Sequence, residues 1–161
     1  MIRQASTNDI PLIRAMAEVV FRRTYKEILS PEQMEYMMDM MYSEESLLKQ
    51  MEDGVFFICD GRGYASVRPD GNTSDGMPRY HLEKLYVMPE AQKTGLGKEL
   101  FETACGWVKA RENRALLELN VNRGNPSLGF YEHLGMTRAR SGDFPIGNGF
   151  YMNDYIMALN L

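Results

Sequence analysis

The sequence predicts a mixed α/β (α+β) fold built on one central sheet. Two observations lead to this class. Apolar runs with strand-like composition cluster as hairpins, and amphipathic helical stretches stand before and between them. The chain has 161 residues, of which 44% are hydrophobic and 25% are charged, and these values are typical of one globular domain. No repeat or linker divides the sequence, so residues 1–161 are expected to form a single domain.

Three helices are expected after a first strand at residues 2–5. Each begins at a residue whose side-chain oxygen can cap the first turn: Ser6 or Thr7, then Ser30, then Ser43. Pro31 suits the start of the second helix because no backbone donor is needed there. The first helix is expected to end near residue 23 and the third near residue 51.

Hairpins and two further helices are expected in the rest of the chain. Glycine, proline and asparagine mark the turns, and helical periodicity returns after residue 94. The expected order is a strand at 55–59, a turn at 60–63, a strand at 64–67, a loop at 69–78, a strand at 80–87, a helix from 94 to about 113, a strand at 115–121, a short helix ended by Gly135, and strands at 136–140 and 150–159.

Methionine is concentrated in the second predicted helix. Five of the 13 methionines fall between positions 34 and 41. Four of them, at 34, 37, 38 and 41, share one helical stripe. A packed helical face is the favoured interpretation, while an adaptable apolar lining and a dimer contact stay open.

Charge and cysteine content exclude several classes of protein. The net charge of −4 argues against a nucleic-acid-binding domain. Cys59 and Cys105 are far apart and form no CxxC motif, so neither a disulfide framework nor a cysteine zinc site is expected, and Cys105 is expected to be a core residue. No apolar run is long enough to span a membrane, and the first residues lack a signal-peptide core. We therefore expect a cytoplasmic protein that binds neither nucleic acid nor membrane and holds no metal.

The most informative segment is the loop at residues 92–98, where a strand ends and a helix begins. Two glycines allow close approach of the backbone, and the unpaired N–H groups of a first helical turn can hold phosphate oxygens. A Walker loop is excluded by Gln92 and Glu99, and a dinucleotide fingerprint is excluded by Leu100. A tight strand–helix turn without a ligand is the alternative for these glycines.

Two stretches resemble the signatures of the GCN5-related N-acetyltransferase (GNAT) superfamily. Residues 92–97 are similar to its Gln/Arg-x-x-Gly-x-Gly/Ala acetyl-CoA signature, and residues 119–136 resemble its second signature, with Met136 where phenylalanine is usual. The ending at 146–155 is similar to one branch of small bacterial members. The resemblance implies a three-layer fold with a mostly antiparallel sheet splayed between its fourth and fifth strands.

The resemblance also implies acetyl-CoA as co-substrate. The coenzyme-binding residues that it implies are Leu85, Tyr86, Val87, Gln92, Lys93, Thr94, Gly95, Leu96, Gly97, Lys98, Asn120, Asn125, Ser127 and Tyr131. Asn125 is expected to orient the pantetheine arm, to cap its helix, or both. Lys93 and Arg123 are surface cations that could also meet a nucleotide phosphate.

Acetyl transfer to an amine needs a base for the amine and an acid for the leaving thiolate. Tyr131 is the expected acid, because the resemblance places it near the coenzyme sulfur and a phenol stays protonated at neutral pH. The resemblance places the candidate bases at His81 and Glu83, and simple alternation predicts that these residues share one strand face with Leu85 and Val87. Packing of Tyr131 and a solvated strand end are the alternatives to these roles.

The resemblance implies that the acceptor meets residues near the end of the first helix, and residues near the C-terminus are further candidates. The candidates for acceptor binding are Phe21, Tyr25, Ile28 and Tyr151. The predicted reaction is acetylation of a primary amine of a small molecule, such as a polyamine, an amino acid or an amino sugar. A non-catalytic acyl-CoA sensor and an enzyme that acetylates protein N-termini or lysines are the alternatives, and a homodimer stays open.

Overall fold

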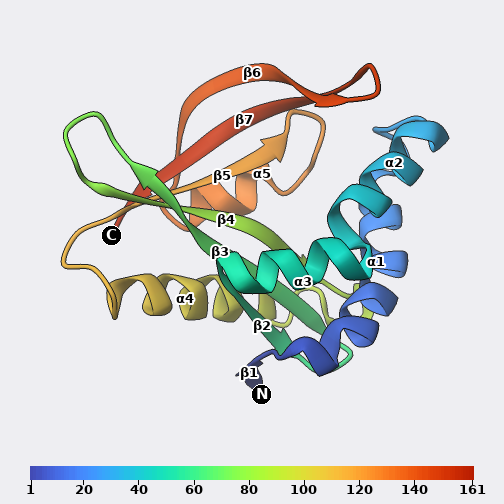
Figure 1. Cartoon of the computed structure of the whole chain (residues 1–161), viewed down its shortest axis with the longest axis horizontal. Helices are drawn as coiled ribbons and strands as arrows, with labels where there is room; N and C mark the ends of the chain where they lie inside the picture. The colour runs from blue at the N-terminus through green and yellow to red at the C-terminus, as the bar shows by residue number, and fades with distance from the viewer.

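The computed structural model describes residues 1–161 as helices packed on both faces of one seven-stranded sheet (Figure 1). The strand order is β1-β2-β3-β4-β5-β7-β6, and only β4 and β5 pair in parallel. The strands are β1 (Ile2–Gln4), β2 (Val55–Cys59), β3 (Gly63–Asn72), β4 (Pro78–Val87), β5 (Leu116–Asn122), β6 (Thr137–Gly147) and β7 (Phe150–Asn160). The predicted fold class is therefore confirmed.

Helices form the two outer layers. The first face of the sheet is covered by α1 (Ile10–Tyr25), α2 (Pro31–Tyr42) and α3 (Glu44–Asp53), and the second face by α4 (Leu96–Lys109) and α5 (Leu128–His133). Single turns of 3-10 helix, η1 (Thr7–Asp9) and η2 (Pro89–Ala91), precede α1 and the loop before α4. No helix is long and apolar enough to cross a membrane.

The predicted caps explain where α2 and α3 begin. The Ser30 hydroxyl accepts a hydrogen bond from the Gln33 N–H at 3.1 Å, and the Ser43 hydroxyl accepts one from the Ser46 N–H at 3.2 Å. Each bond satisfies a first-turn donor that has no partner inside the helix. The sequence therefore fixes both helix starts locally.

Each face of the sheet has its own hydrophobic core. The core under α4 and α5 has 21 buried residues, and the core under α1–α3 has 14. Met34, Met37 and Met38 belong to the second core, so the favoured interpretation of the methionine stripe is confirmed. Cys59 and Cys105 are free and buried, and burial raises the pKa of the Cys105 thiol to about 11, as suits a core residue.

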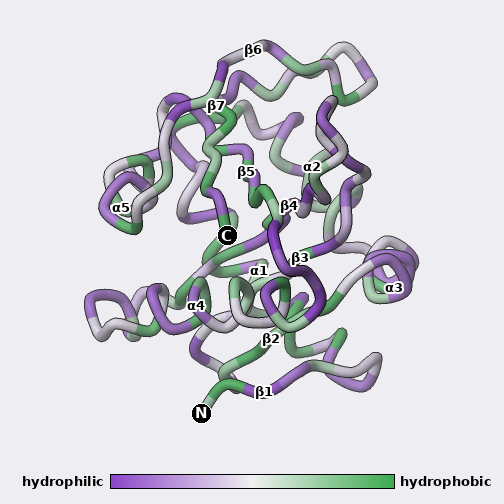
Figure 2. Tube along the Cα trace, turned by 90° about the vertical axis from the view of Figure 1, so that its left-hand side faces the viewer, coloured by the Kyte–Doolittle hydropathy of each residue, from purple (hydrophilic) through white to green (hydrophobic).

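Two hairpins extend beyond their predicted limits. β3 and β4 pair from Gly63 to Asn72, although residues 69–78 were expected to be a loop. β6 continues to Gly147 beside β7 instead of ending near residue 140. Pairing with a neighbour holds these glycine- and proline-containing segments in strands, despite their low intrinsic preference. In Figure 2 β2 is hydrophobic along its length, whereas β6 carries hydrophilic residues, which suits its exposed position.

β4 contains a bulge that changes which side chains share a face. Its register against β3 shifts between the pairs Ser66↔Lys84 and Val67↔Leu82, which leaves Glu83 as the extra residue. Leu82 and Leu85 consequently both pack in the α4-side core, while Lys84 lies among rings of the other core. The prediction of one continuous alternating face from residue 81 to residue 87 is therefore wrong.

Candidate functional site

A cavity of about 730 Å³ opens where β4 and β5 separate. The two strands pair only from Arg79↔Leu116 to His81↔Glu118 and then diverge. The cavity is bordered by the second halves of both strands, the end of α1, the N-terminus of α4, and α5. Because no pairing continues across the gap, the facing strand edges are available to an extended ligand.

All the predicted coenzyme residues except Thr94 and Leu96 line this cavity. The Thr94 hydroxyl instead donates to the Ala91 carbonyl at 2.5 Å, within the loop before α4. Leu96 is buried in the core beneath α4. The side chains of these two residues therefore shape the loop and the core and do not line the cavity, whereas the Leu96 N–H belongs to the first turn of α4.

The loop before α4 is built to bring backbone close to a ligand. Lys93 and Gly95 both have positive φ angles, of 62° and 89°. The conformation places Gly95 as the helix N-cap, and no side chain caps this helix. A side chain at Gly97 would place its Cβ 3.2 Å from Phe130 Cζ, so glycine is needed for α5 to approach. The first-turn N–H groups of α4, with Lys93 and Lys98 nearby, can hold an anion.

Three polar side chains meet near the middle of the cavity. The Tyr25 and Tyr86 hydroxyls are 3.3 Å apart, and the Asn125 side-chain amide donates to the Tyr25 hydroxyl at 3.5 Å. The Asn125 oxygen also accepts from the Ser127 N–H at 2.9 Å, so Asn125 orders the start of α5 and faces the cavity. Both expected roles of Asn125 are thus compatible with its position.

Tyr131 lies in the cavity wall and is 8% exposed. Its pKa is raised, mainly because burial disfavours the phenolate and further because Tyr25 is near. The phenol is therefore held as a neutral O–H group. Its ring packs at a steep angle against Phe130, with centroids 5.2 Å apart. A buried neutral phenol at this position can donate a hydrogen bond to a ligand in the cavity.

The two candidate bases lie in different places. Glu83 lines the cavity and forms an ion pair with Arg68, whose guanidinium also bonds Asp70 at 3.2 Å. His81 is not among the cavity residues, its Nδ1 is 4.0 Å from the Asp70 carboxylate, and burial lowers its pKa. The geometry therefore favours Glu83 as the group that faces a ligand.

The predicted acceptor residues are only partly brought together. Tyr25 lines the cavity. Phe21 is fully buried, packed against the rings of Tyr25, Tyr42 and Tyr86, and its predicted contact with an acceptor is corrected to a core role. Ile28 lies outside the cavity lining. Tyr151 is 52% exposed, is also outside the lining, and is held through its carbonyl, which accepts from the Gln33 side chain at 2.7 Å.

Other residues at the site were missed or misplaced by sequence reasoning. Arg23 and Thr24 at the end of α1 line the cavity, and their only signal was proximity to Tyr25. Arg123 bonds Asp143 at 2.6 Å and the Gly142 carbonyl at 3.0 Å, so it braces the β6–β7 hairpin. Behind the cavity, the Asn120 amide donates to the buried Asp154 carboxylate at 3.1 Å, and burial raises the pKa of Asp154.

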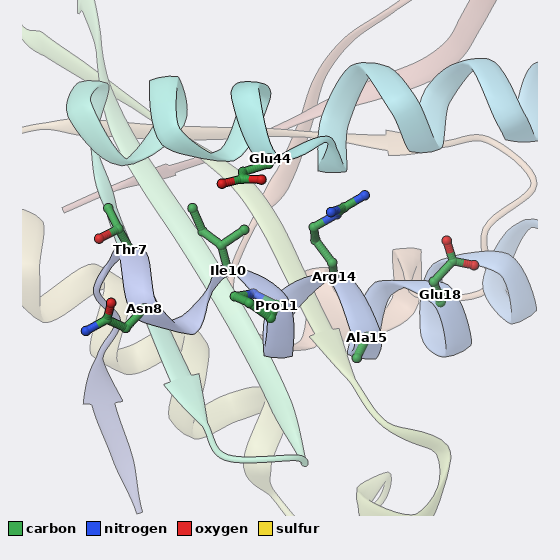
Figure 3. A pocket seen from close by; sticks show the side chains of 8 residues that line it. All are labelled: Thr7, Asn8, Ile10, Pro11, Arg14, Ala15, Glu18 and Glu44. Atoms are coloured by element: carbon green, nitrogen blue, oxygen red, sulfur yellow. The ribbon is translucent and has the colours of Figure 1, made fainter.

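Another hollow, of about 580 Å³, lies between the start of α1 and α3 (Figure 3). Arg14, Glu18 and Glu44 border it, and of its eight lining residues only Ile10 is buried. It holds no predicted site residue. No group of three or more histidine, cysteine, aspartate or glutamate side chains is arranged to hold a metal ion. Most of the predicted site residues instead line the cavity between β4 and β5.

Comparison with known proteins identifies the family. The sequence matches the Acetyltransferase (GNAT) family over residues 20–136. A relative from Lactobacillus delbrueckii subsp. lactis, described as an uncharacterized N-acetyltransferase in the pepI 3′ region, is 30% identical over 157 residues, which are 91% of this chain and 90% of the relative.

Solved structures share the fold. The PaiA N-acetyltransferase from Thermoplasma acidophilum, in complex with coenzyme A, has a TM-score of 0.80 at 24% identity, covering 100% of this chain and 98% of that one. A GCN5-related N-acetyltransferase from Rhodopseudomonas palustris has a TM-score of 0.81 at 18% identity, with coverage of 100% and 95%. The ribosomal-protein-S18-alanine N-acetyltransferase from Escherichia coli has a TM-score of 0.67 at 22% identity, with coverage of 99% and 92%.

Proposed function

Because the chain belongs to the acetyltransferase (GNAT) family, we propose that it moves the acetyl group of acetyl-CoA to a primary amine of a small molecule. Transfer takes place by direct attack while both substrates are bound. The observation that carries the proposal is the cavity between β4 and β5, which combines an anion site at α4 with the buried phenol of Tyr131. Holding both substrates together can supply roughly 7–11 kcal/mol of the barrier without a covalent intermediate.

The cavity residues suit the parts of acetyl-CoA. The pyrophosphate would lie on the backbone N–H groups at 95–98, with Lys93 and Lys98 adding positive charge. The extended pantetheine arm would follow the open edge of β4 at Leu85 and Val87, opposite Asn120 on β5. This placement leaves the thioester near Tyr131 and Tyr25.

Two protein groups, Tyr131 and Glu83, account for the two proton transfers of the proposed reaction. The amine nitrogen bonds to the thioester carbonyl carbon and the carbon–sulfur bond breaks. Tyr131 gives its phenolic proton to the leaving thiolate and regains one from solvent. The attacking amine loses its proton to water held by Glu83, and Arg68 positions the Glu83 carboxylate.

Tyr131→Phe tests the proposed acid. We expect the turnover rate to fall about 100-fold, since a positioned acid contributes at least that much, while the dissociation constant of acetyl-CoA stays within about twofold. Thiol release with an amine panel measures the rate, and calorimetry measures binding. Tyr155→Phe is the matched control, because Tyr155 contacts Arg138 through its ring outside the cavity. Full turnover in Tyr131→Phe would remove this role.

Glu83→Gln and His81→Ala separate the two candidate bases. We expect Glu83→Gln to lower turnover by about 100-fold and to lose the acidic limb of its pH–rate profile. His81→Ala keeps that limb, because the imidazole is outside the cavity. Retention of the limb in Glu83→Gln with its loss in His81→Ala would reverse the assignment.

The acceptor is proposed to be a small amine, as expected from the sequence. It would enter beside Arg23, Thr24 and Tyr25 at the end of α1. An acyl-CoA sensor is the alternative, and the same amine panel distinguishes it, since a sensor binds acetyl-CoA without transferring the acetyl group to any amine. The single domain, the cytoplasmic location and a homodimer remain predictions from the sequence.

A further inference from the structure

A second cavity lies on the α1–α3 side of the sheet, beneath α2 and α3, and has a volume of about 170 Å³. One part of its wall is apolar, formed by Met40, Met41 and Phe56. The other part is polar and includes Gln50, Ser66 and Lys84. Glu83 lines both this cavity and the one between β4 and β5, so the two are neighbours across β4.

Lys84 is a buried cation without a carboxylate partner. It is 3% exposed, and its Nζ donates to the Gln50 side-chain oxygen at 2.6 Å. The Nζ also lies 5.1 Å and 5.8 Å from the ring centroids of Tyr42 and Phe56. Burial lowers the pKa of Lys84 from 10.5 to about 8, which leaves most of the side chain charged at neutral pH.

The acidic neighbours of Lys84 are already engaged. Asp53 pairs with Lys49 at 3.1 Å, and Glu83 pairs with Arg68. The Ser66 hydroxyl, in a residue that is 3% exposed, is buried and has no hydrogen-bond partner. An ammonium group and a hydroxyl group therefore border one small cavity, and both can donate to an acceptor that the protein does not supply.

We propose that this cavity binds a small carboxylate ion between the Lys84 ammonium and the Ser66 hydroxyl. A carboxylate has two acceptor oxygens for these two donors, and its charge neutralises the buried cation. The apolar wall at Met40, Met41 and Phe56 receives a short aliphatic remainder, of the size found in acetate or propionate. The carboxylate belongs either to a free ion or to the acceptor itself, and the second source rests on the proposed acetyltransferase function.

Acetate is the probe, titrated into the whole chain at pH 7 in a buffer without carboxylates and without acetyl-CoA. Amide shifts of Gln50, Phe56 and Ser66 in ¹H–¹⁵N spectra report binding, with sodium chloride titrated in parallel. We expect Lys84→Met to weaken binding by more than about tenfold and Ser66→Ala by about fivefold, the effects of losing a charged and a neutral hydrogen bond. Lys109→Met, an exposed lysine on α4, should change it less than about twofold.

The affinity should also fall as the pH rises above about 8, by up to about tenfold per unit, because Lys84 then loses its charge. Tyr42 of α2, Asp53 of α3, Arg68 of β3 and Glu83 of β4 also surround Lys84, so the pH series is repeated on Lys84→Met to subtract their titration. The absence of acetate binding overturns the proposal, as does binding that Lys84→Met leaves unchanged.

Kinetics then distinguish the two sources of the carboxylate. A carboxylate on the acceptor predicts that Lys84→Met raises KM for amines carrying a carboxylate by about tenfold and leaves other amines unchanged. A free ion predicts that acetate changes the rate with an amine lacking a carboxylate. Acetate titration needs no acetyl transfer, so its failure is separate from a failure of the proposed function.

Discussion

The cores on the two faces of the sheet are built from different kinds of side chains. Beneath α4 the core is mostly leucine, valine and alanine, and it supports the loop at 92–98. Beneath α1–α3 the smaller core holds four buried methionines, against two in the other core, and it adjoins the enclosed Lys84. The α4 side therefore supports the proposed coenzyme site with mostly aliphatic side chains. The α1–α3 side contains flexible side chains and buried polar atoms, which suits a region that adapts to a smaller ligand.

The largest expected difference between the faces is in the free energy of unfolding lost when one buried side chain on each face is truncated to alanine. Leu100 of α4 is fully buried and packs under Gly63, where a Cβ would lie 3.2 Å from Leu100 Cδ1. We expect Leu100→Ala to lower the free energy of unfolding by about 4 kcal/mol and Met37→Ala by about 2 kcal/mol. The methionine side can close around a cavity more easily, because its neighbours have more rotatable bonds.

Urea denaturation of the two variants measures both losses. Met157→Ala, at a fully buried methionine in the α4-side core, is the matched control for residue type. A loss for Met37→Ala equal to that for Leu100→Ala would show that the two faces are equally rigid.

The next largest effect concerns the buried charge. We expect Lys84→Met to raise the free energy of unfolding at pH 7 by about 1–3 kcal/mol, because a pKa lowered from 10.5 to about 8 corresponds to about 3 kcal/mol of destabilisation. The lost hydrogen bond to Gln50 offsets part of this gain. The cost is fully present below pH 8, where native and unfolded states both carry the proton. It shrinks between pH 8 and 10.5, where only the unfolded state still carries it.

Parallel urea titrations of wild-type protein and Lys84→Met from pH 7 to pH 10 measure this difference. A carboxylate-free buffer is needed, since an ion bound at Lys84 would stabilise the wild type alone. Lys109→Met serves as the surface control. A gap that widens with pH would contradict the assigned direction of the Lys84 pKa.

The loop at 92–98 was predictable from the sequence, and so were two helix starts on the other face of the sheet. The loop at 92–98 is recognisable because an anion site at a helix start requires glycine at fixed positions, and Gly95 and Gly97 meet that need through φ and close approach. The helix starts at Ser30 and Ser43 were predictable for the same reason, because each capping hydrogen bond joins residues three positions apart. Features of this kind depend on residues that are close together in the sequence, so the sequence alone predicts them.

Features set by partners distant in the sequence were harder to predict. The bulge at Glu83 depends on the register against β3, so simple alternation misplaced His81 and gave no sign that Lys84 is enclosed. Phe21 and Tyr25 share one face of α1, and only the rotation of that helix against the sheet decides which ring is core and which lines the cavity. β6 extends to Gly147 because β7 pairs with it.

The smallest expected effect tests the buried hydrogen bonds of the α1–α3 face. The Tyr42 and Tyr64 hydroxyls are 2.7 Å apart in full burial, and this burial raises both pKa values, so both stay neutral. We expect Tyr42→Phe to lower the free energy of unfolding by about 1–2 kcal/mol, because it leaves the Tyr64 hydroxyl buried without its partner. Tyr64→Phe should cost a similar amount. The double variant should cost less than the sum of the two single losses, because no hydroxyl is then left unpaired. Additive losses in this double-mutant cycle, followed by urea denaturation, would mean that the hydrogen bond contributes nothing and that only ring packing holds this face together.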